Sequence, residues 1–229
     1  MKIKLVYTTE SMKEKQKMKE KVKEFIVKNL IWIILFICLI GFLAIAEDVF
    51  NKELMNGDIV GYKLISTFLI SDFATPIAKF ITNFGGAIFL AVLTIILFIL
   101  IKNKKIGVSI FSNLAIITAL NQLLKNILQR PRPTEYRIIE ETGYSFPSGH
   151  SMISMAFYGY LIYLIYKYVK NKYVKWTSMV LLSLLICSIG ISRIYLGVHY
   201  TSDVLGGFLI SISYLVIYIS AVNKFLIEK

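Results

Sequence analysis

The chain has 229 residues, 56% of them hydrophobic, and the hydrophobic residues fall in long runs. A soluble domain rarely has this composition, so we predict a polytopic membrane protein of the all-α class. The formal net charge is +12, which in a soluble protein would suggest nucleic-acid binding. Here the basic residues lie beside apolar runs, as is typical of cytoplasmic flanks that contact anionic lipid headgroups. We therefore expect a membrane partner and no nucleic acid.

The first segment is a lysine-rich arm at residues 1–28. Ser11 and Glu14 have the spacing of a helix-capping box, and a ragged apolar stripe follows them. The arm therefore fits either a helix that lies on the cytoplasmic membrane surface or a solvated tail. We expect the remainder, residues 29–229, to form one domain that spans the membrane six times.

Six apolar segments are predicted as spans, at residues 29–46, 75–101, 107–124, 148–166, 176–191 and 200–222. The first is interpreted as an uncleaved signal anchor, because its run is long for a signal peptide although Ala44-Ile45-Ala46 resembles a cleavage site. Residues 47–71 contain only a short, interrupted apolar run, so we expect an external loop with a surface-lying helix. The second span is expected to start at Thr75-Pro76 and to run through Gly85-Gly86.

The placement of lysines predicts the orientation. The N-terminal arm, the turns at residues 102–105 and 167–175, and the C-terminal tail are lysine-rich and share one side in a six-span topology. That side, with both termini, is predicted to be cytoplasmic in a plasma-membrane protein. The loop of residues 126–147 and the turn of residues 192–203 then lie outside, and the chain's polar clusters occur there.

The turn of residues 192–203 carries Arg193, His199 and Asp203 between two apolar runs. His199 and Asp203 are four positions apart, so on a helix they share a face. The carboxylate can orient the imidazole and leave its other nitrogen free to react, while Arg193 can offer a planar fork to an anion. Alternatively, each is a satisfied polar residue at a helix end, and Asp203 is a helix cap.

Two further clusters precede this turn. Lys125 and Arg132 supply cations, and several cations around one point favour a multiply charged anion such as phosphate. Ser148 and Gly149 follow a proline at a predicted helix start, where free backbone N–H groups can bind phosphate oxygens. His150 comes next, and one oriented imidazole with a second nearby suits a nucleophile and a general acid.

Together the clusters resemble the three-part signature of the type 2 phosphatidic acid phosphatase superfamily of membrane lipid phosphatases. The K-x6-R-P motif matches Lys125 to Arg132-Pro133, P-S-G-H matches residues 147–150, and S-R-x5-H-x3-D matches residues 192–203. Arg130-Pro131 is a neighbouring pair that the family spacing does not select. The signature covers residues 125–203, and the six-span layout extends the likeness over most of the chain.

The resemblance implies a phosphohistidine mechanism. His199 would attack phosphorus, Asp203 would orient it, and His150 would protonate the leaving oxygen and then assist water. The phosphate would be held by five residues: Lys125, Arg132, Arg193, Ser148 and Gly149. No cofactor and no metal are implied, since the carboxylates are too sparse for a two-metal site.

The favoured function is hydrolysis of a lipid phosphate or diphosphate at the outer leaflet. Undecaprenyl diphosphate is preferred, because small six-span proteins that resemble this one often recycle that carrier in bacteria. Phosphatidylglycerophosphate and phosphatidate are alternative substrates, and lipid phosphotransfer is an alternative reaction.

A non-catalytic lipid-phosphate binder or transporter is a different class of protein. The presence of His150 and of the His199–Asp203 pair argues against it. A vanadate haloperoxidase shares much of the signature, but such enzymes are soluble. The sequence does not indicate the oligomeric state.

Overall fold

The computed structural model describes residues 18, 28–52 and 55–227, and all regular secondary structure in these residues is helical. The predicted all-α class is therefore confirmed. The predicted N-terminal arm lies outside the described residues, apart from Met18 and Lys28. The first described helix is Lys28–Phe50. The others are α2 (Asn56–Phe68), α3 (Ala74–Asn83), α4 (Ala87–Leu100), α5 (Lys104–Leu128), α6 (Gly149–Tyr168), α7 (Lys172–Tyr195), α8 (Thr201–Val222) and the π-helix η1 (Asn223–Ile227).

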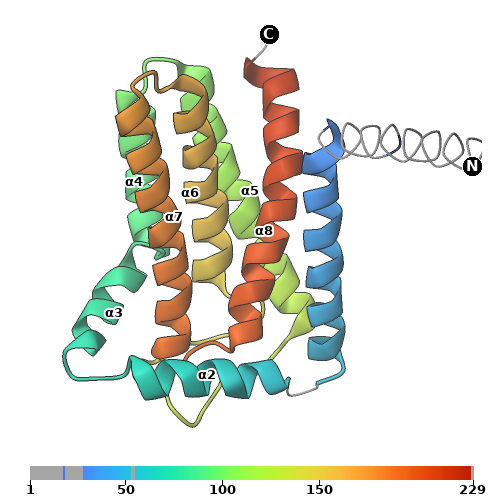
Figure 1. Cartoon of the computed structure of the whole chain (residues 1–229), viewed down its shortest axis with the longest axis vertical. Helices are drawn as coiled ribbons and strands as arrows, with labels where there is room; N and C mark the ends of the chain where they lie inside the picture. The colour runs from blue at the N-terminus through green and yellow to red at the C-terminus, as the bar shows by residue number, and fades with distance from the viewer. Residues whose placement is uncertain (1–17, 19–27, 53–54, 228–229) are drawn as a thin grey trace, which may run out of the picture.

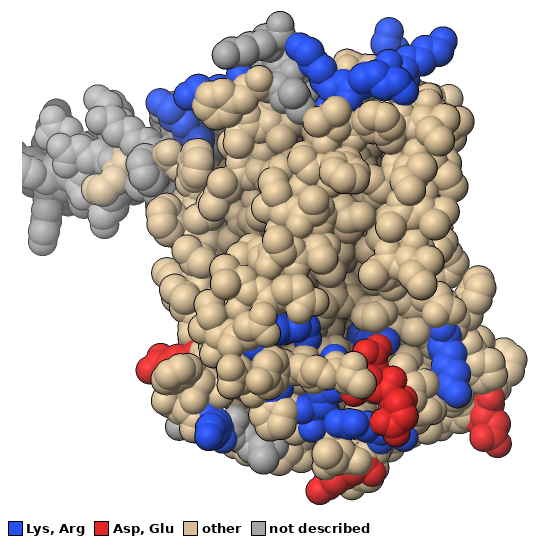
Figure 2. Space-filling view, turned by 180° about the vertical axis from the view of Figure 1, so that it is seen from behind, with Lys and Arg blue, Asp and Glu red and all other residues tan. Residues whose placement is uncertain are grey.

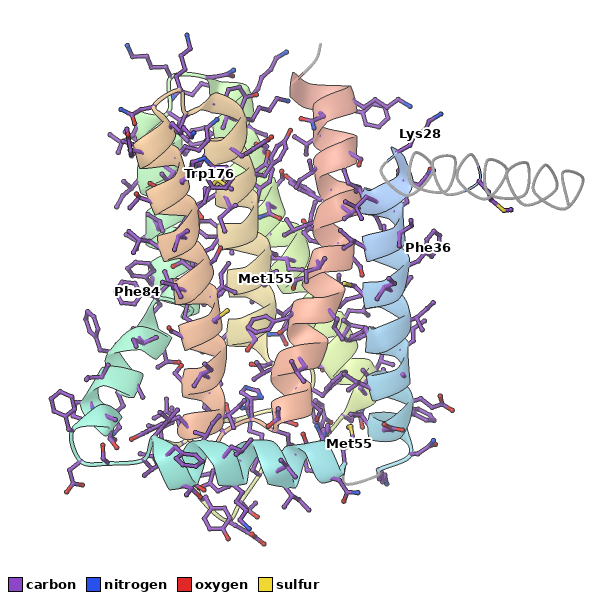
Figure 3. All side chains as sticks on the ribbon, viewed as in Figure 1. Lys28, Phe36, Met55, Phe84, Met155 and Trp176 are labelled. Atoms are coloured by element: carbon purple, nitrogen blue, oxygen red, sulfur yellow. The ribbon has the colours of Figure 1, made fainter. Side chains whose placement is uncertain are left out.

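The long helices stand side by side, and α2 crosses one end of the bundle (Figure 1). The surface helix predicted within residues 47–71 is thus present as α2. Large apolar side chains face outward from the bundle, among them Phe36 and Trp176, which are 59% and 52% exposed (Figure 3). Such a surface suits lipid rather than water, as expected for a membrane-embedded protein that crosses the bilayer several times.

Among the described residues, four helices are long and apolar enough to cross a membrane, or five if α3 and α4 count as one broken span. The predicted number of six is not reached, because α6 is not among them. This 20-residue helix carries many polar side chains. Two of them are hydrogen-bonded inside the bundle: the Tyr158 hydroxyl donates to the Phe84 carbonyl, and the Tyr160 hydroxyl donates to Ser109 Oγ. A helix that packs against helices on most sides does not need an apolar surface all round.

The continuous helix predicted through Gly85-Gly86 is wrong. The chain breaks there, and α3 and α4 are bent by 49°. Gly86 is extended, with φ −73° and ψ 146°. A side chain at Gly85 would place its Cβ 2.8 Å from Ser154 Oγ. The break therefore brings the backbone at Gly85 directly against α6.

The starts of α6 and α8 lie in close contact. A Cβ at Gly207 would lie 3.2 Å from the Ser148 carbonyl oxygen, so the two helix backbones approach each other without a side chain between them. The Ser148 N–H donates to the Asp203 carbonyl at 3.0 Å, and Ser211 Oγ donates to the Met152 carbonyl at 2.7 Å. These contacts fix the relative positions of the second and third sequence motifs.

Candidate active site

The end of the bundle that α2 crosses contains all three polar clusters. They lie in the 129–148 loop, the turn of residues 196–200, and the adjacent helix ends. Both signs of charge occur at this end, whereas the opposite end is covered with basic side chains (Figure 2). The basic side chains of the opposite end belong to Lys28, Lys102, Lys104, Lys105, Lys167, Lys170, Lys172, Lys175 and Lys224.

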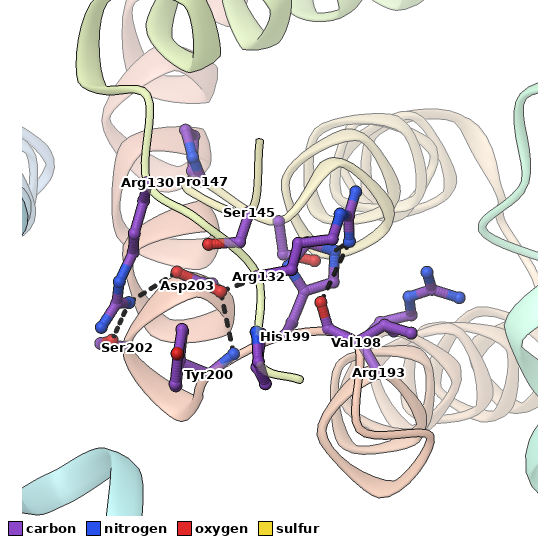
Figure 4. Close-up of polar contacts among 12 residues, drawn as sticks. Arg130, Arg132, Ser145, Pro147, Arg193, Val198, His199, Tyr200, Ser202 and Asp203 are labelled. Atoms are coloured by element: carbon purple, nitrogen blue, oxygen red, sulfur yellow. Dashed lines mark hydrogen bonds and ion pairs between the residues drawn. The ribbon is translucent and has the colours of Figure 1, made fainter. Parts of the chain in front are cut away.

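His199 lies in the turn between α7 and α8, with its side chain only 2% exposed (Figure 4). Nδ1 is 3.3 Å from Asp203 Oδ2, and Nε2 is 3.1 Å from the Nη1 of Arg132. A guanidinium can only donate, so Nε2 must accept and the ring proton belongs on Nδ1. Burial lowers the pKa of His199 to about 4, although Asp203 acts in the opposite direction. The ring is therefore neutral near pH 7, with the Nε2 lone pair toward the arginine.

The Asp203 carboxylate contacts both the backbone of the turn and the His199 ring. Its Oδ2 accepts the Tyr200 N–H at 2.8 Å as well as facing His199. The carboxylate thus caps the first turn of α8, where negative charge is favourable, and also orients the imidazole. The two alternatives for this residue, a helix cap and a partner of His199, are both realised by one side chain.

Arg132 is held in place by backbone carbonyls. Its guanidinium donates to the carbonyls of Thr142, Gly143 and Val198, each at 3.0 Å. These bonds fix the planar group beside His199 without neutralising it. Its positive charge remains available to an anion that approaches Nε2.

Arg193 comes from the last turn of α7, and its side chain is 1% exposed. It donates to Thr82 Oγ1 at 2.8 Å and forms an ion pair with Glu141. Glu141 also lies 3.9 Å from Arg132. Burial alone would raise the pKa of Glu141, but Arg193, Arg132 and His199 outweigh it and hold this pKa below its usual range. An ionised carboxylate therefore lies between the two arginines.

The remaining predicted residues gather around the same point. Lys125 donates to the Tyr144 carbonyl, and its Cε would lie 3.9 Å from a Cβ at Gly149. Ser148 is the N-cap of α6 and is fully buried. His150 is in the first turn of α6, close enough to Arg193, His199, Arg132 and Lys125 to interact with them electrostatically. The structure thus brings all the predicted site residues together at one end of the bundle.

The sequence of residues 105–227 matches the PAP2 superfamily. This stretch is more than half of the chain and contains all three motifs. The chain belongs to the PAP2 superfamily. The resemblance drawn from the motifs is therefore confirmed.

Curated relatives carry two different names. The chain is 40% identical over 91 residues to phosphatidylglycerophosphatase B of Bacillus subtilis (strain 168), which is 39% of this chain and 44% of that protein. The matched part therefore spans less than half the length of that relative. The chain is also 26% identical over 167 residues to undecaprenyl-diphosphatase of Sulfolobus acidocaldarius, covering 70% of this chain and 73% of that protein.

Two solved structures share the fold. A crystal structure of a transmembrane PAP2-type phosphatidylglycerolphosphate phosphatase from Bacillus subtilis superposes with a TM-score of 0.73 at 26% identity, covering 83% of this chain and 96% of that one. LpxE from Aquifex aeolicus superposes with a TM-score of 0.55 at 21% identity, covering 69% and 92%. The second likeness shows the fold alone.

Sequence reasoning missed the environment of Arg130. Arg130 lies outside the motif, because the family spacing selects Arg132, yet the Arg130 guanidinium donates to Asp203 Oδ1 at 2.7 Å (Figure 4). The same guanidinium pairs with Asp58 of α2, also at 2.7 Å. The available signal was that the Arg-Pro-Arg-Pro stretch contains Arg130 in addition to the arginine that the motif selects. Nothing near Asp58 in the sequence pointed to this partner.

Proposed function

We propose that the protein hydrolyses phosphate or diphosphate esters of membrane lipids through a phosphohistidine intermediate, at the outer membrane–water interface. The observation that carries this proposal is the setting of the His199 ring. Its Nδ1 faces the Asp203 carboxylate, and its Nε2 faces the cation of Arg132. A neutral, oriented imidazole beside a cationic group is what nucleophilic attack on a phosphate requires.

In the first step, a phosphate oxygen replaces His199 Nε2 as the acceptor of the Arg132 N–H, which frees the Nε2 lone pair. His199 Nε2 then attacks phosphorus, a P–N bond forms, and the P–O bond to the leaving group breaks. His150 must carry a proton before this step, and the negative charge of the bound phosphate favours that protonated form. His150 donates this proton to the leaving oxygen, and Asp203 stabilises the positive charge on the His199 ring. In the second step, His150 takes a proton from water, the water oxygen attacks phosphorus, and the P–N bond breaks. The products are inorganic phosphate and the dephosphorylated lipid.

The charge that develops on the phosphoryl oxygens needs positive partners that are already in place. Lys125, Arg132 and Arg193 take this role in the proposal, with Ser148 and the Gly149 N–H at the N-terminus of α6. We propose that the reaction is metal-independent. Within the described residues, no group of three or more His, Cys, Asp and Glu side chains is placed to hold a metal ion, which supports this choice.

We propose six spans within a single domain of residues 29–229, with α3 and α4 as one broken span and α6 as the span enclosed by the others. The lysine-rich end and both termini are placed in the cytoplasm, with the arm of residues 1–28, and the α2 end outside. The distribution of acid supports this, since the acidic residues of the described segments all fall at or next to the α2 end. They are Glu47, Asp48, Asp58, Asp72, Glu135, Glu140, Glu141 and Asp203.

The preferred substrate is undecaprenyl diphosphate, which would give undecaprenyl phosphate. The relative named undecaprenyl-diphosphatase matches 70% of this chain, which supports that choice. Phosphatidylglycerophosphate is the second candidate, because the relative with that name is more identical over a shorter stretch. Hydrolysis of phosphatidate, and transfer of the phosphoryl group to an acceptor lipid, would both begin with the same attack by His199 on phosphorus.

The test is phosphate release by the purified protein in detergent, with EDTA present, beside the variant His199→Ala. Undecaprenyl diphosphate, phosphatidylglycerophosphate and phosphatidate are compared at equal mole fraction in the micelle. Release that resists EDTA and is lost in the variant supports the proposal, and the preferred lipid identifies the substrate. Release that EDTA abolishes would contradict the metal-independent mechanism. Wild-type cellular function in His199→Asn would favour a non-catalytic lipid-phosphate binder.

A further inference from the structure

Asp58 is the one residue of α2 whose side chain is buried, although the helix lies across the end of the bundle. Its carboxylate is 1% exposed, and a buried carboxylate is costly unless it is paired and hydrogen-bonded. Oδ1 accepts the backbone N–H of Ser202 at 2.8 Å, and Oδ2 accepts the Ser202 hydroxyl at 2.9 Å. Asp58 therefore caps the N-terminus of α8 from a different helix, where free N–H groups and the helix dipole favour an anion.

Arg130 connects this carboxylate to the one beside His199. Nη2 binds Asp58 Oδ2, and Nη1 binds both Asp203 Oδ1 and Ser202 Oγ, each at 2.7 Å. The plane of the guanidinium lies over the Tyr200 ring, with Cζ 4.1 Å from the ring centroid. Its side chain is 7% exposed. Both terminal nitrogens of Arg130 therefore bind buried carboxylates, and these two carboxylates offset its charge.

The two oxygens of Asp203 have separate partners. Oδ1 takes Arg130, while Oδ2 takes His199 Nδ1 and the Tyr200 N–H. The rotation of the carboxylate is thus fixed from both sides, and the rotation of the imidazole follows from it. A continuous line of contacts runs from Asp58 through Arg130 and Asp203 to His199.

We propose that Arg130 and Asp58 are positioning residues for the His199–Asp203 pair, which makes α2 part of the catalytic centre. The proposal rests on the function proposed above. Arg130 also balances the charge of Asp203, which limits how strongly that carboxylate holds a proton on the ring. Removing Arg130 is therefore expected to raise the pKa of His199. Removing the charge of Asp58 leaves Arg130 less neutralised and is expected to lower it.

The charged and titratable groups around His199 other than Arg130 and Asp58 lie on every element that packs against it. They are Asp203 on α8, Arg193 on α7, His150 on α6, Lys125 on α5, and Arg132 and Glu141 on the 129–148 loop. None of these groups is changed in the variants below. A shift in the titration of His199 therefore reports the Asp58–Arg130 pair.

The experiment uses the full-length protein in detergent and three variants: Arg130→Gln, Asp58→Asn and the control Arg137→Gln. Arg137 lies on the same loop and pairs with Glu140, whose side chain is 92% exposed. For Arg130→Gln we expect kcat to fall about 10–100-fold, as is common when a partner that orients a reacting side chain is lost, with KM changed less than about threefold. Arg137→Gln is expected to match the wild type.

A second readout does not depend on activity. The chain has only two histidines, so ¹⁵N-histidine NMR can follow the titration of His199. The variant His150→Gln lacks the His150 signal, and the signal that remains is that of His199. Opposite shifts of the His199 titration in Arg130→Gln and Asp58→Asn support the proposal. The proposal is overturned if the pKa of His199 shifts in neither variant. It is also overturned if this pKa rises toward its ordinary value in both variants, which is the result expected from a general loosening of the site. If Arg130→Gln does not fold, a downward shift in Asp58→Asn supports the proposal and its absence overturns it. Failure of the wild type to release phosphate would contradict the proposed function and leave this NMR result readable.

Discussion

The charged groups on the two sides of the His199 ring are organised differently. On its Nδ1 side, Arg130 lies between Asp58 and Asp203, so one cation faces two carboxylates, all nearly inaccessible to solvent. On its Nε2 side, three cations, Lys125, Arg132 and Arg193, face one carboxylate, that of Glu141, whose side chain is 29% exposed. The first group has a surplus of negative charge and suits a positively charged ring. The second has a surplus of positive charge and suits a phosphate. The difference predicts that changes on the first side alter the state of the ring, while changes on the second side alter how phosphate is bound.

The largest effect is expected at the residue between the two groups. His199→Ala removes the nucleophile and is expected to lower kcat at least about 10⁴-fold, judging from nucleophile deletions in other covalent enzymes. The measurement is phosphate release at saturating lipid. The melting temperature in detergent serves as the control for folding. Residual activity within about tenfold of the wild type would contradict a phosphohistidine.

Asp203→Asn is expected to lower kcat about a thousand-fold, because the amide no longer fixes the ring tautomer. The substitution also removes one of the two carboxylates that pair with Arg130. Because breaking a buried ion pair is destabilising and Asp58 still pairs with Arg130, we expect the free energy of unfolding to fall by about 2 kcal/mol. His199→Ala should not show this loss of stability. A thermal melt of both variants in the same detergent checks the difference. Equal melting temperatures would mean that the buried charges on the Nδ1 side do not contribute to stability in the way that their pairing predicts.

Arg193→Lys tests the other side of the ring. Lysine keeps the charge but loses the planar fork, so kcat/KM is expected to fall about a hundred-fold. Stability should change less than in Asp203→Asn, since the partner Glu141 is partly exposed. Steady-state kinetics beside a thermal melt give both values. A fall in stability without a fall in kcat/KM would assign Arg193 to packing instead.

Much of this arrangement follows from the sequence, because apolar runs predict spans and motif spacing predicts which polar residues meet. The pairing of Asp58 with Ser202 does not follow, since the two are 144 residues apart and no local pattern relates them. Arg130 and Arg132 sit in the same repeated dipeptide, and only the folded loop directs one to each side of His199. The sequence does not show that Glu141 contacts two arginines, because nothing local distinguishes it from the exposed Glu140 beside it.

The break between α3 and α4 was missed for a related reason. A Gly-Gly pair inside an apolar run is compatible with a continuous helix that packs closely and also with a bend. Contact of Gly85 with Ser154 on α6 decides between them, and that contact is tertiary. The polar character of α6 likewise becomes intelligible only when its neighbours are known.

Glu141→Gln is the one change expected to improve binding. The carboxylate lies between Arg132 and Arg193, where it competes with a phosphate for the same donors. Removing its charge is expected to lower KM about 3–10-fold, which corresponds to about 1 kcal/mol. Glu140→Gln is the matched control, because that side chain is 92% exposed. A higher KM in Glu141→Gln alone would show that Glu141 orients Arg193 rather than competing with substrate.

The smallest effect concerns pH. Because the pKa of His199 is lowered from 6.5 to about 4, its neutral, reactive form persists as the pH falls. At pH 5 about nine-tenths of the ring should still be neutral, whereas at an ordinary pKa only about 3% would be. The acid limb of kcat/KM should therefore lie near pH 4 once the ionisation of the substrate phosphate, with a pKa of about 6, is measured by phosphorus NMR and divided out. An acid limb near pH 6.5 would mean that the ring is solvated and that the charges on its Nε2 side do not act on it.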